Sequence, residues 1–234
     1  MYLELLQQIR NISQELQELV LINNDKKVSD NIPKSFFVLG FEISKGLELF
    51  CIAIDKQAYS QAASLLRQLL EQIAVFRILE KYPDCRKEYK HFYDIRFGIY
   101  QGDKNKELEL ENIYKQLEDK KLKQGKQKFA ELGWLLSIND DYGIEVLLQL
   151  SEISDLIKWR AFLNNFVHSN IFAIQLIDIE SYVEDFIYIS AIICDVLMCS
   201  YHNITGYRFD SNINSNREKF ATLFKEITLM RTRK

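Results

Sequence analysis

The chain has 234 residues, of which 47% are hydrophobic and 27% are charged, a composition typical of a folded globular protein. Its net charge of −3 at pH 7 provides no overall basic surplus, so the whole chain does not indicate binding to nucleic acid or to anionic membranes. It contains only 8 glycines and 2 prolines, and this scarcity of helix-breaking residues predicts an all-α fold.

Apolar residues recur with helical spacing along almost the whole chain. This periodicity predicts helices at about 2–22, 34–55, 57–81, 84–98, 152–170, 178–202 and 213–231, and a charged helical region at 102–128 that breaks at Gly125 and leads into a further helix. Gly40 and Gly46 lie inside the second helix and mark close packing against a neighbour. Asp178 is expected to cap a nearly all-round apolar, central helix. We therefore predict an all-α fold of about 9–10 helices.

We expect one domain over residues 1–234, with the first helix (2–22) and the last helix (213–231) as peripheral or dimerisation elements. The only short β-like run, at 171–178, is interpreted as a helix end and a connector. The four cysteines have neither CxxC pairing nor metal-ligand spacing, which predicts a reducing cytosol without disulfides. The longest apolar stretch, 182–199, contains three acids and is short for a membrane span, so we expect a cytoplasmic protein without membrane association.

Several common enzyme classes lack support, because the chain contains no G-x-x-x-x-G-K-[ST], G-x-G-x-x-G, H-E-x-x-H or G-x-S-x-G motif. We accordingly expect no metal and no cofactor. Two local stretches are basic: 118–128 holds five lysines against two acids, and 217–234 holds six Lys or Arg against two acids. Either stretch can contact phosphate backbones, although charge runs are more often solvated surfaces.

The first candidate pair is Arg67 and Glu71, which lie four residues apart on one face of the third helix. Their neighbours are alanines and leucines, an unusual setting for two charges. The pair is either a solvated helical edge or a partly buried pair that further hydrogen bonds hold in place.

The second candidate group lies in the stretch "LNNFVHSN", where Asn164 and His168 are again four residues apart. Arg160, eight residues before His168, lies at the border of the same helical face. A neutral imidazole can exchange a proton near pH 7, and an arginine can bind a phosphate. This combination of residue types suits metal-independent RNA cleavage. The alternative is a core histidine that Asn or a backbone carbonyl satisfies. His91 and His202 are assigned no catalytic role.

Two segments together, "AASLLRQLLEQ" (62–72) and "WRAFLNNFVHSN" (159–170), resemble a bacterial branch of helical proteins related to the HEPN superfamily. The resemblance covers residues 58–170 and implies a HEPN-like core at about 34–203. It further implies an antiparallel helical bundle that is often a homodimer, with the histidine-bearing helices near the dimer axis. Many HEPN members are ribonucleases of toxin–antitoxin or defence systems, whose motif has Arg, four to six residues, then His.

Two functions follow. In the first, the protein is a metal-independent endoribonuclease acting as a toxin or defence effector, with His168, Arg160 and Asn164 as catalytic residues. His168 is the acid or base, Arg160 or Arg67 holds the scissile phosphate, and Asn164 orients the imidazole or the substrate. In the second, it is a non-catalytic module that binds a nucleotide, an RNA, an antitoxin or another protein, and Arg67, Glu71 and His168 form a structural network. The seven residues between Arg160 and His168 favour the second function. In either function, Arg67 and Glu71 can take part if the third helix packs against the helix at 152–170.

Overall fold

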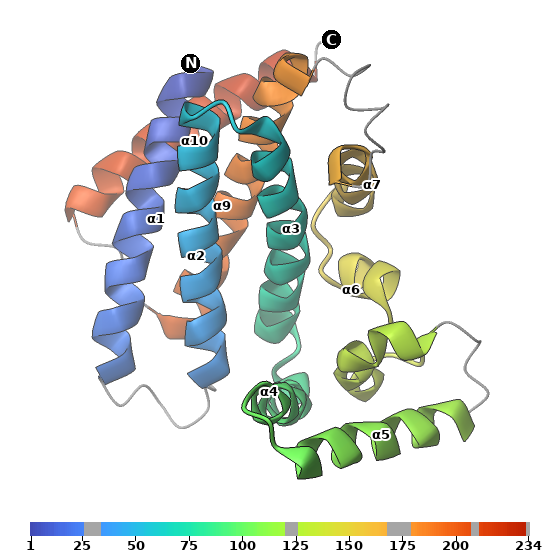
Figure 1. The fold of residues 1–234 in the computed structure, drawn as a ribbon. Coiled ribbons are helices and arrows are strands. Elements are labelled where there is room, and N and C mark those ends of the chain that lie inside the picture. Colours follow the sequence, from blue (N-terminus) through green and yellow to red (C-terminus); the bar gives the residue numbers. More distant parts are fainter. Residues whose placement is uncertain (26–33, 120–125, 168–178, 207–210, 233–234) are drawn as a thin grey trace.

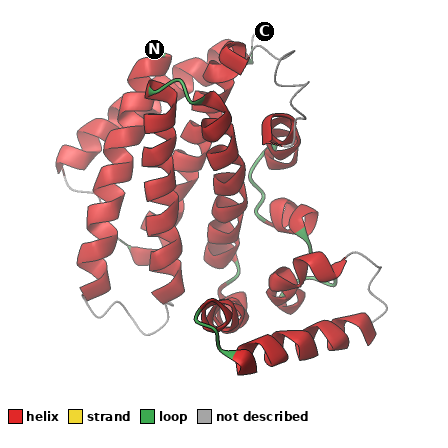
Figure 2. Cartoon of the chain, viewed as in Figure 1, coloured by secondary structure: helices red, strands yellow, loops and turns green. Residues whose placement is uncertain are grey.

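The computed structural model describes residues 1–25, 34–119, 126–167, 179–206 and 211–232. Over these ranges the chain forms nine α-helices and three 3₁₀-helices, and none of the described residues forms a strand (Figure 2). The predicted all-α helical bundle is therefore confirmed.

Five long helices make up the main bundle: α1 (Tyr2–Asp25), α2 (Lys34–Asp55), α3 (Tyr59–Lys81), α9 (Val183–Thr205) and α10 (Ser211–Arg231). The shorter elements between α3 and α9 are η1 (Pro83–Cys85), α4 (Arg86–Tyr100), α5 (Lys104–Asp119), η2 (Lys126–Ser137), α6 (Ile144–Leu150), α7 (Leu156–Val167) and η3 (Ile179–Tyr182). In Figure 1, α1, α2, α3 and α9 lie side by side and α10 runs obliquely across them, while α6 and α7 lie beside α3 and α4 and α5 lie beyond its lower end.

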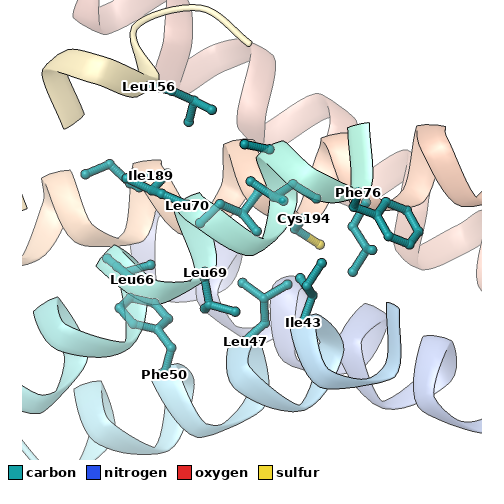
Figure 3. Packing of buried hydrophobic residues seen from close by; sticks show 14 of the residues in the cluster. Ile43, Leu47, Phe50, Leu66, Leu69, Leu70, Phe76, Leu156, Ile189 and Cys194 are labelled. Carbon is teal, nitrogen blue, oxygen red and sulfur yellow. The ribbon is translucent and has the colours of Figure 1, made fainter. Parts of the chain in front are cut away.

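The core sits where α3 meets α2 and α9, and Figure 3 shows its packing. Helix α3 has ten buried residues, because apolar side chains occupy most of its circumference. Helix α9 has eleven, which confirms the prediction of a central, nearly all-round apolar helix. Helix α1, expected at the periphery or at a dimer interface, also contributes to this core with Leu5, Leu6, Ile9, Ile12, Leu16 and Leu19. It packs against α2, α9 and α10.

Helices α2 and α3 form an antiparallel hairpin with a three-residue connection, in which Gln57 has a φ of 56°. A Cβ atom on Gly46 would lie 2.6 Å from Leu69 Cδ2, and one on Gly40 would lie 3.3 Å from Phe76 Cε2. These contacts confirm that both glycines mark a close helix–helix approach. The hairpin thereby holds the α2 and α3 backbones close together beside the candidate site.

The structure differs from the sequence-based expectation around residue 150. A helix was expected to begin at about 152, whereas α6 ends at Leu150 and α7 begins at Leu156. Glu152 and Asp155 adopt positive φ angles of 52° and 62°, so the helix cannot run through this turn. The helix expected after Gly125 is instead the 3₁₀-helix η2. Asp178, the expected cap, lies outside the described residues, and α9 ends three residues later than expected, before Gly206 in the left-handed region.

Helix α10 is fastened at both ends. Near its start, Asn216 Nδ2 donates a hydrogen bond to Glu15 Oε1 on α1 at 2.8 Å. At its end, Arg231 pairs with Asp185 and lies over the Tyr188 ring, 4.7 Å from the centroid. In the described part of the chain, no helix combines the length and the low polarity that crossing a membrane requires.

Glu15 provides a test of this docking. Burial raises the pKa of its carboxyl above 4.5, against the lowering effect of the Asn216 hydrogen bond, and Oε2 is buried without a hydrogen-bond partner. The pKa of Glu15 is higher in the folded state than in the unfolded state. Burying the ionised carboxylate therefore lowers the stability by its full amount above the folded-state pKa, and this loss disappears below the unfolded-state pKa. We expect Glu15→Gln to be more stable than wild type at pH 7 and equally stable near pH 4. Urea unfolding across this pH range measures the difference, and a pH-independent difference would contradict the assignment.

Candidate functional site

Helix α3 carries a narrow polar stripe between fully buried positions. Arg67 and Glu71 lie one turn apart, while Leu66 and Leu70 beside them are fully buried. The two charged side chains keep exposed fractions of only 25% and 26%, since α7 packs along this side of α3. The pair is therefore partly buried, and the third helix packs on the later one, so Arg67 and Glu71 can take part in either function.

Helix α7 presents the complementary side chains because its apolar and polar residues share one face. Leu156, Leu163 and Phe166 are buried. Arg160 is four residues after Leu156, and Asn164 is one turn further along the same face. Burial of the leucines against the bundle thus brings Arg160 and Asn164 to the polar stripe of α3.

Four side chains meet at this contact. Arg67 Nε donates a hydrogen bond to Asn164 Oδ1 at 2.7 Å, and Arg160 Nε donates one to Glu71 Oε1 at 2.8 Å. Arg67 Nη2 lies 3.4 Å from the same Glu71 oxygen. We call Arg67, Glu71, Arg160 and Asn164 the α3–α7 network. Two arginines and one glutamate give it a net charge of +1.

The network joins two helices whose residues are 89 to 97 positions apart in the sequence. Arg160, with an exposed fraction of 22%, pairs through Nε, and neither of its terminal nitrogens pairs with a described residue. Glu71 receives both arginines on Oε1, which leaves Oε2 without a partner among the described residues. Charge-assisted bonds in such partly buried settings are stronger than those of exposed pairs.

The remaining predicted groups are placed as follows. His168 follows the last residue of α7 directly and lies outside the described residues. His91 is exposed on α4, with Nε2 3.4 Å from Glu109 Oε1, and His202 lies in the last turn of α9. Of the two basic stretches, most of 118–128 lies outside the described side chains. In 217–234, Arg231 is occupied by Asp185 and Tyr188.

A cleft of about 650 Å³ opens on the other side of Glu71, where the α2–α3 hairpin faces the second group of helices. We call it the aromatic cleft; α2, α3, α4, η2 and α6 contribute to its lining. Its lining residues are Val38, Leu39, Glu42, Gln68, Glu71, Gln72, Val75, Tyr89, Phe92, Tyr93, Arg96, Phe97, Leu132, Trp134, Ile144 and Leu147. Its size is that of typical small-molecule sites in proteins.

A row of aromatic rings forms the α4 and η2 side of this cleft. Tyr89, Tyr93 and Phe97 lie at successive turns of α4, with centroids 6.5 Å apart in each neighbouring pair. Trp134 of η2 extends the row and meets Tyr89 edge-on, at 5.3 Å. Burial raises the pKa of Tyr89 to about 12, so its hydroxyl stays protonated at neutral pH and can donate a hydrogen bond. Trp134 is buried and Tyr89 is largely buried, so Tyr93 and Phe97, the latter 57% exposed, provide the stacking surface for a flat ring.

Opposite charges line the cleft without meeting. Glu42 on α2 and Arg96 on α4 are both exposed, and neither makes a hydrogen bond or an ion pair with a described residue. Gln68 and Gln72 on α3 add amide groups that can donate and accept. The cleft therefore offers apolar faces together with both donors and acceptors, the usual make-up of a small-molecule site.

Glu71 belongs to the α3–α7 network and to the cleft wall at once. The sequence identified Glu71 and its arginine partner but did not identify the cleft. The spacing of Tyr89, Tyr93 and Phe97 at i, i+4 and i+8 was the available signal, because these positions share one helical face. Glu42, Arg96 and Trp134 carried no local signal, since only the packing of separate elements brings them together.

Among the described residues, no group of three or more His, Cys, Asp or Glu side chains is arranged to hold a metal ion. No protein-family model, curated protein or solved structure matches the chain, so the resemblance to the HEPN superfamily rests on its two sequence segments.

A double-mutant cycle of Glu71→Ala and Arg160→Ala tests the network. Glu71→Ala should destabilise the fold by about 1–3 kcal/mol, because two arginines lose their acceptor. The coupling free energy between Glu71 and Arg160 should be about 1 kcal/mol. The exposed ion pair between Asp155, directly before α7, and Lys158 of α7 is the control, with an expected coupling free energy below about 0.5 kcal/mol. Equal coupling in the two pairs, measured by urea unfolding, would contradict a stabilising network.

Proposed function

We propose that the protein is a non-catalytic helical module that binds a nucleotide, free or within RNA. The base would stack on the aromatic row of the cleft. The phosphate would approach the α3–α7 network, whose net charge is +1. The observation that carries this proposal is the position of Glu71, which joins the cleft wall to both arginines.

The non-catalytic part of the proposal rests on how the arginines are used. Arg67 and Arg160 each direct Nε at a fixed acceptor of the neighbouring helix. Both side chains thereby hold α7 against α3, which is a structural role. The terminal nitrogens of Arg160 can still bind an anionic group. This arrangement agrees with the longer Arg160–His168 spacing and with nucleotide binding in the HEPN superfamily, which the two sequence segments resemble.

Fluorescence of Trp134 offers a direct binding assay, with Trp159→Phe as background so that only the cleft tryptophan reports. Titration with a mixture of the four ribonucleoside monophosphates should quench Trp134 saturably. Tyr93→Ala should weaken binding at least about fivefold, because stacking on one aromatic side chain contributes about 1–3 kcal/mol. Tyr100→Ala is the control, since Tyr100 is 85% exposed on the same helix and does not line the cleft. Absence of saturable quenching both by these nucleotides and by a single-stranded RNA would overturn the proposal.

A second candidate function is the metal-independent endoribonuclease. One observation favours it: Arg160 and Asn164 lie on α7, which ends directly before His168 in the sequence, and both belong to the network that contains Arg67. The test is cleavage of a structured RNA in the presence of EDTA by wild type and by His168→Ala. Cleavage that disappears in His168→Ala, with unchanged thermal stability, would support the nuclease and overturn the non-catalytic proposal. We expect no cleavage by either protein.

A further inference from the structure

The aromatic cleft contains two charged groups that the α3–α7 network does not use. Glu42 enters from α2 and Arg96 from α4, and the two do not form an ion pair with each other or with another described residue. Helix α2 packs on α3, while the row of aromatic rings lies on α4 and η2, and Arg96 belongs to the same helix α4. A ligand lying on the aromatic row can therefore present one edge to Glu42 and another to Arg96.

Each of these groups has a fixed hydrogen-bonding character. An ionised carboxylate only accepts, and a guanidinium only donates. The Glu42 side chain is exposed on α2, so its carboxylate is open to a ligand in the cleft. A complementary ligand must therefore carry donors on the edge that meets Glu42 and acceptors on the edge that meets Arg96, on a flat ring that can stack.

Among nucleobases, guanine has this pattern. Its N1–H and exocyclic N2–H₂ are adjacent donors that can bind both oxygens of one carboxylate, and its O6 and N7 are adjacent acceptors suited to a guanidinium. Adenine places an acceptor at N1 between its donor group and C2, so the carboxylate would face a lone pair. Uracil and cytosine are single rings and offer less stacking surface to the aromatic row.

We infer that the cleft selects guanine, with Glu42 as the residue that determines specificity and Arg96 as the residue that meets the O6/N7 edge. This inference rests on the proposed nucleotide-binding function and names the base that it takes. The source of the base is either a free guanine nucleotide or a guanine within single-stranded RNA, because the same edges are presented by both.

The experiment compares GMP and AMP by isothermal titration calorimetry, using the full chain and its Glu42→Gln variant. Wild type should bind GMP at least about tenfold more tightly than AMP, since a bidentate pair typically discriminates by about that much or more. Glu42→Gln should lose most of this preference while retaining AMP binding, because a glutamine can donate to adenine N1. Glu145→Gln, an exposed acid on α6 that does not line the cleft, is the matched control.

The outcomes separate the two proposals. Equal binding of GMP and AMP by wild type, or an unchanged preference in Glu42→Gln, overturns guanine selection and leaves nucleotide binding intact. Binding of neither nucleotide, together with no binding of the RNA probes UUGUU and UUAUU, overturns both proposals. Tighter binding of UUGUU than of GMP, with UUAUU weak, supports the inference with RNA as the source. Circular dichroism melting of each variant establishes that the exposed substitution leaves the fold intact.

Discussion

The enclosure of α3 is the constraint on which the rest of the structure depends. This helix packs against α2, α9, α7 and α6, and its remaining side carries the residues Gln68, Gln72 and Val75 that line the aromatic cleft. Burying ten side chains from one helix is a large apolar gain, and it leaves very little room for charge. Arg67 and Glu71 are tolerated there because α7 supplies Arg160 and Asn164 as partners.

Glu71 is consequently a shared group. One oxygen holds two arginines at the α3–α7 contact, and the other has no partner among the described residues on a side chain that lines the aromatic cleft. A ligand in the cleft that binds this carboxylate would compete with the two arginines and so alter the packing of α7 on α3. The helix preceding His168 and the cleft are therefore linked through one side chain, whichever ligand the cleft takes.

The cleft lies where the shorter elements of the chain meet the bundle of long helices. The long helices form a close-packed bundle, whereas the shorter elements α4, η2 and α6 meet the α2–α3 hairpin more loosely and enclose about 650 Å³. Aromatic side chains cover the wall of this space on α4, and polar side chains occupy α2 and α3. That division supports a flat, hydrogen-bonding ligand over a purely apolar one, because unpaired polar groups at an apolar site would cost binding free energy.

The amino-acid sequence alone predicted the helical class, the approximate positions of most helices and the close approach at Gly40 and Gly46. It also determined that Arg67 and Glu71 share a face, and that Arg160 and Asn164 share another. These features depend on spacings of a few residues, which helical geometry converts directly into neighbours.

The break before α7 was missed, because positive φ angles at Glu152 and Asp155 have no strong local signal. Only the tertiary structure decided that Glu71 meets Arg160, 89 positions away, and that five elements enclose the aromatic cleft. Such contacts follow from how buried faces match one another across the whole bundle, and no short stretch of sequence contains that information.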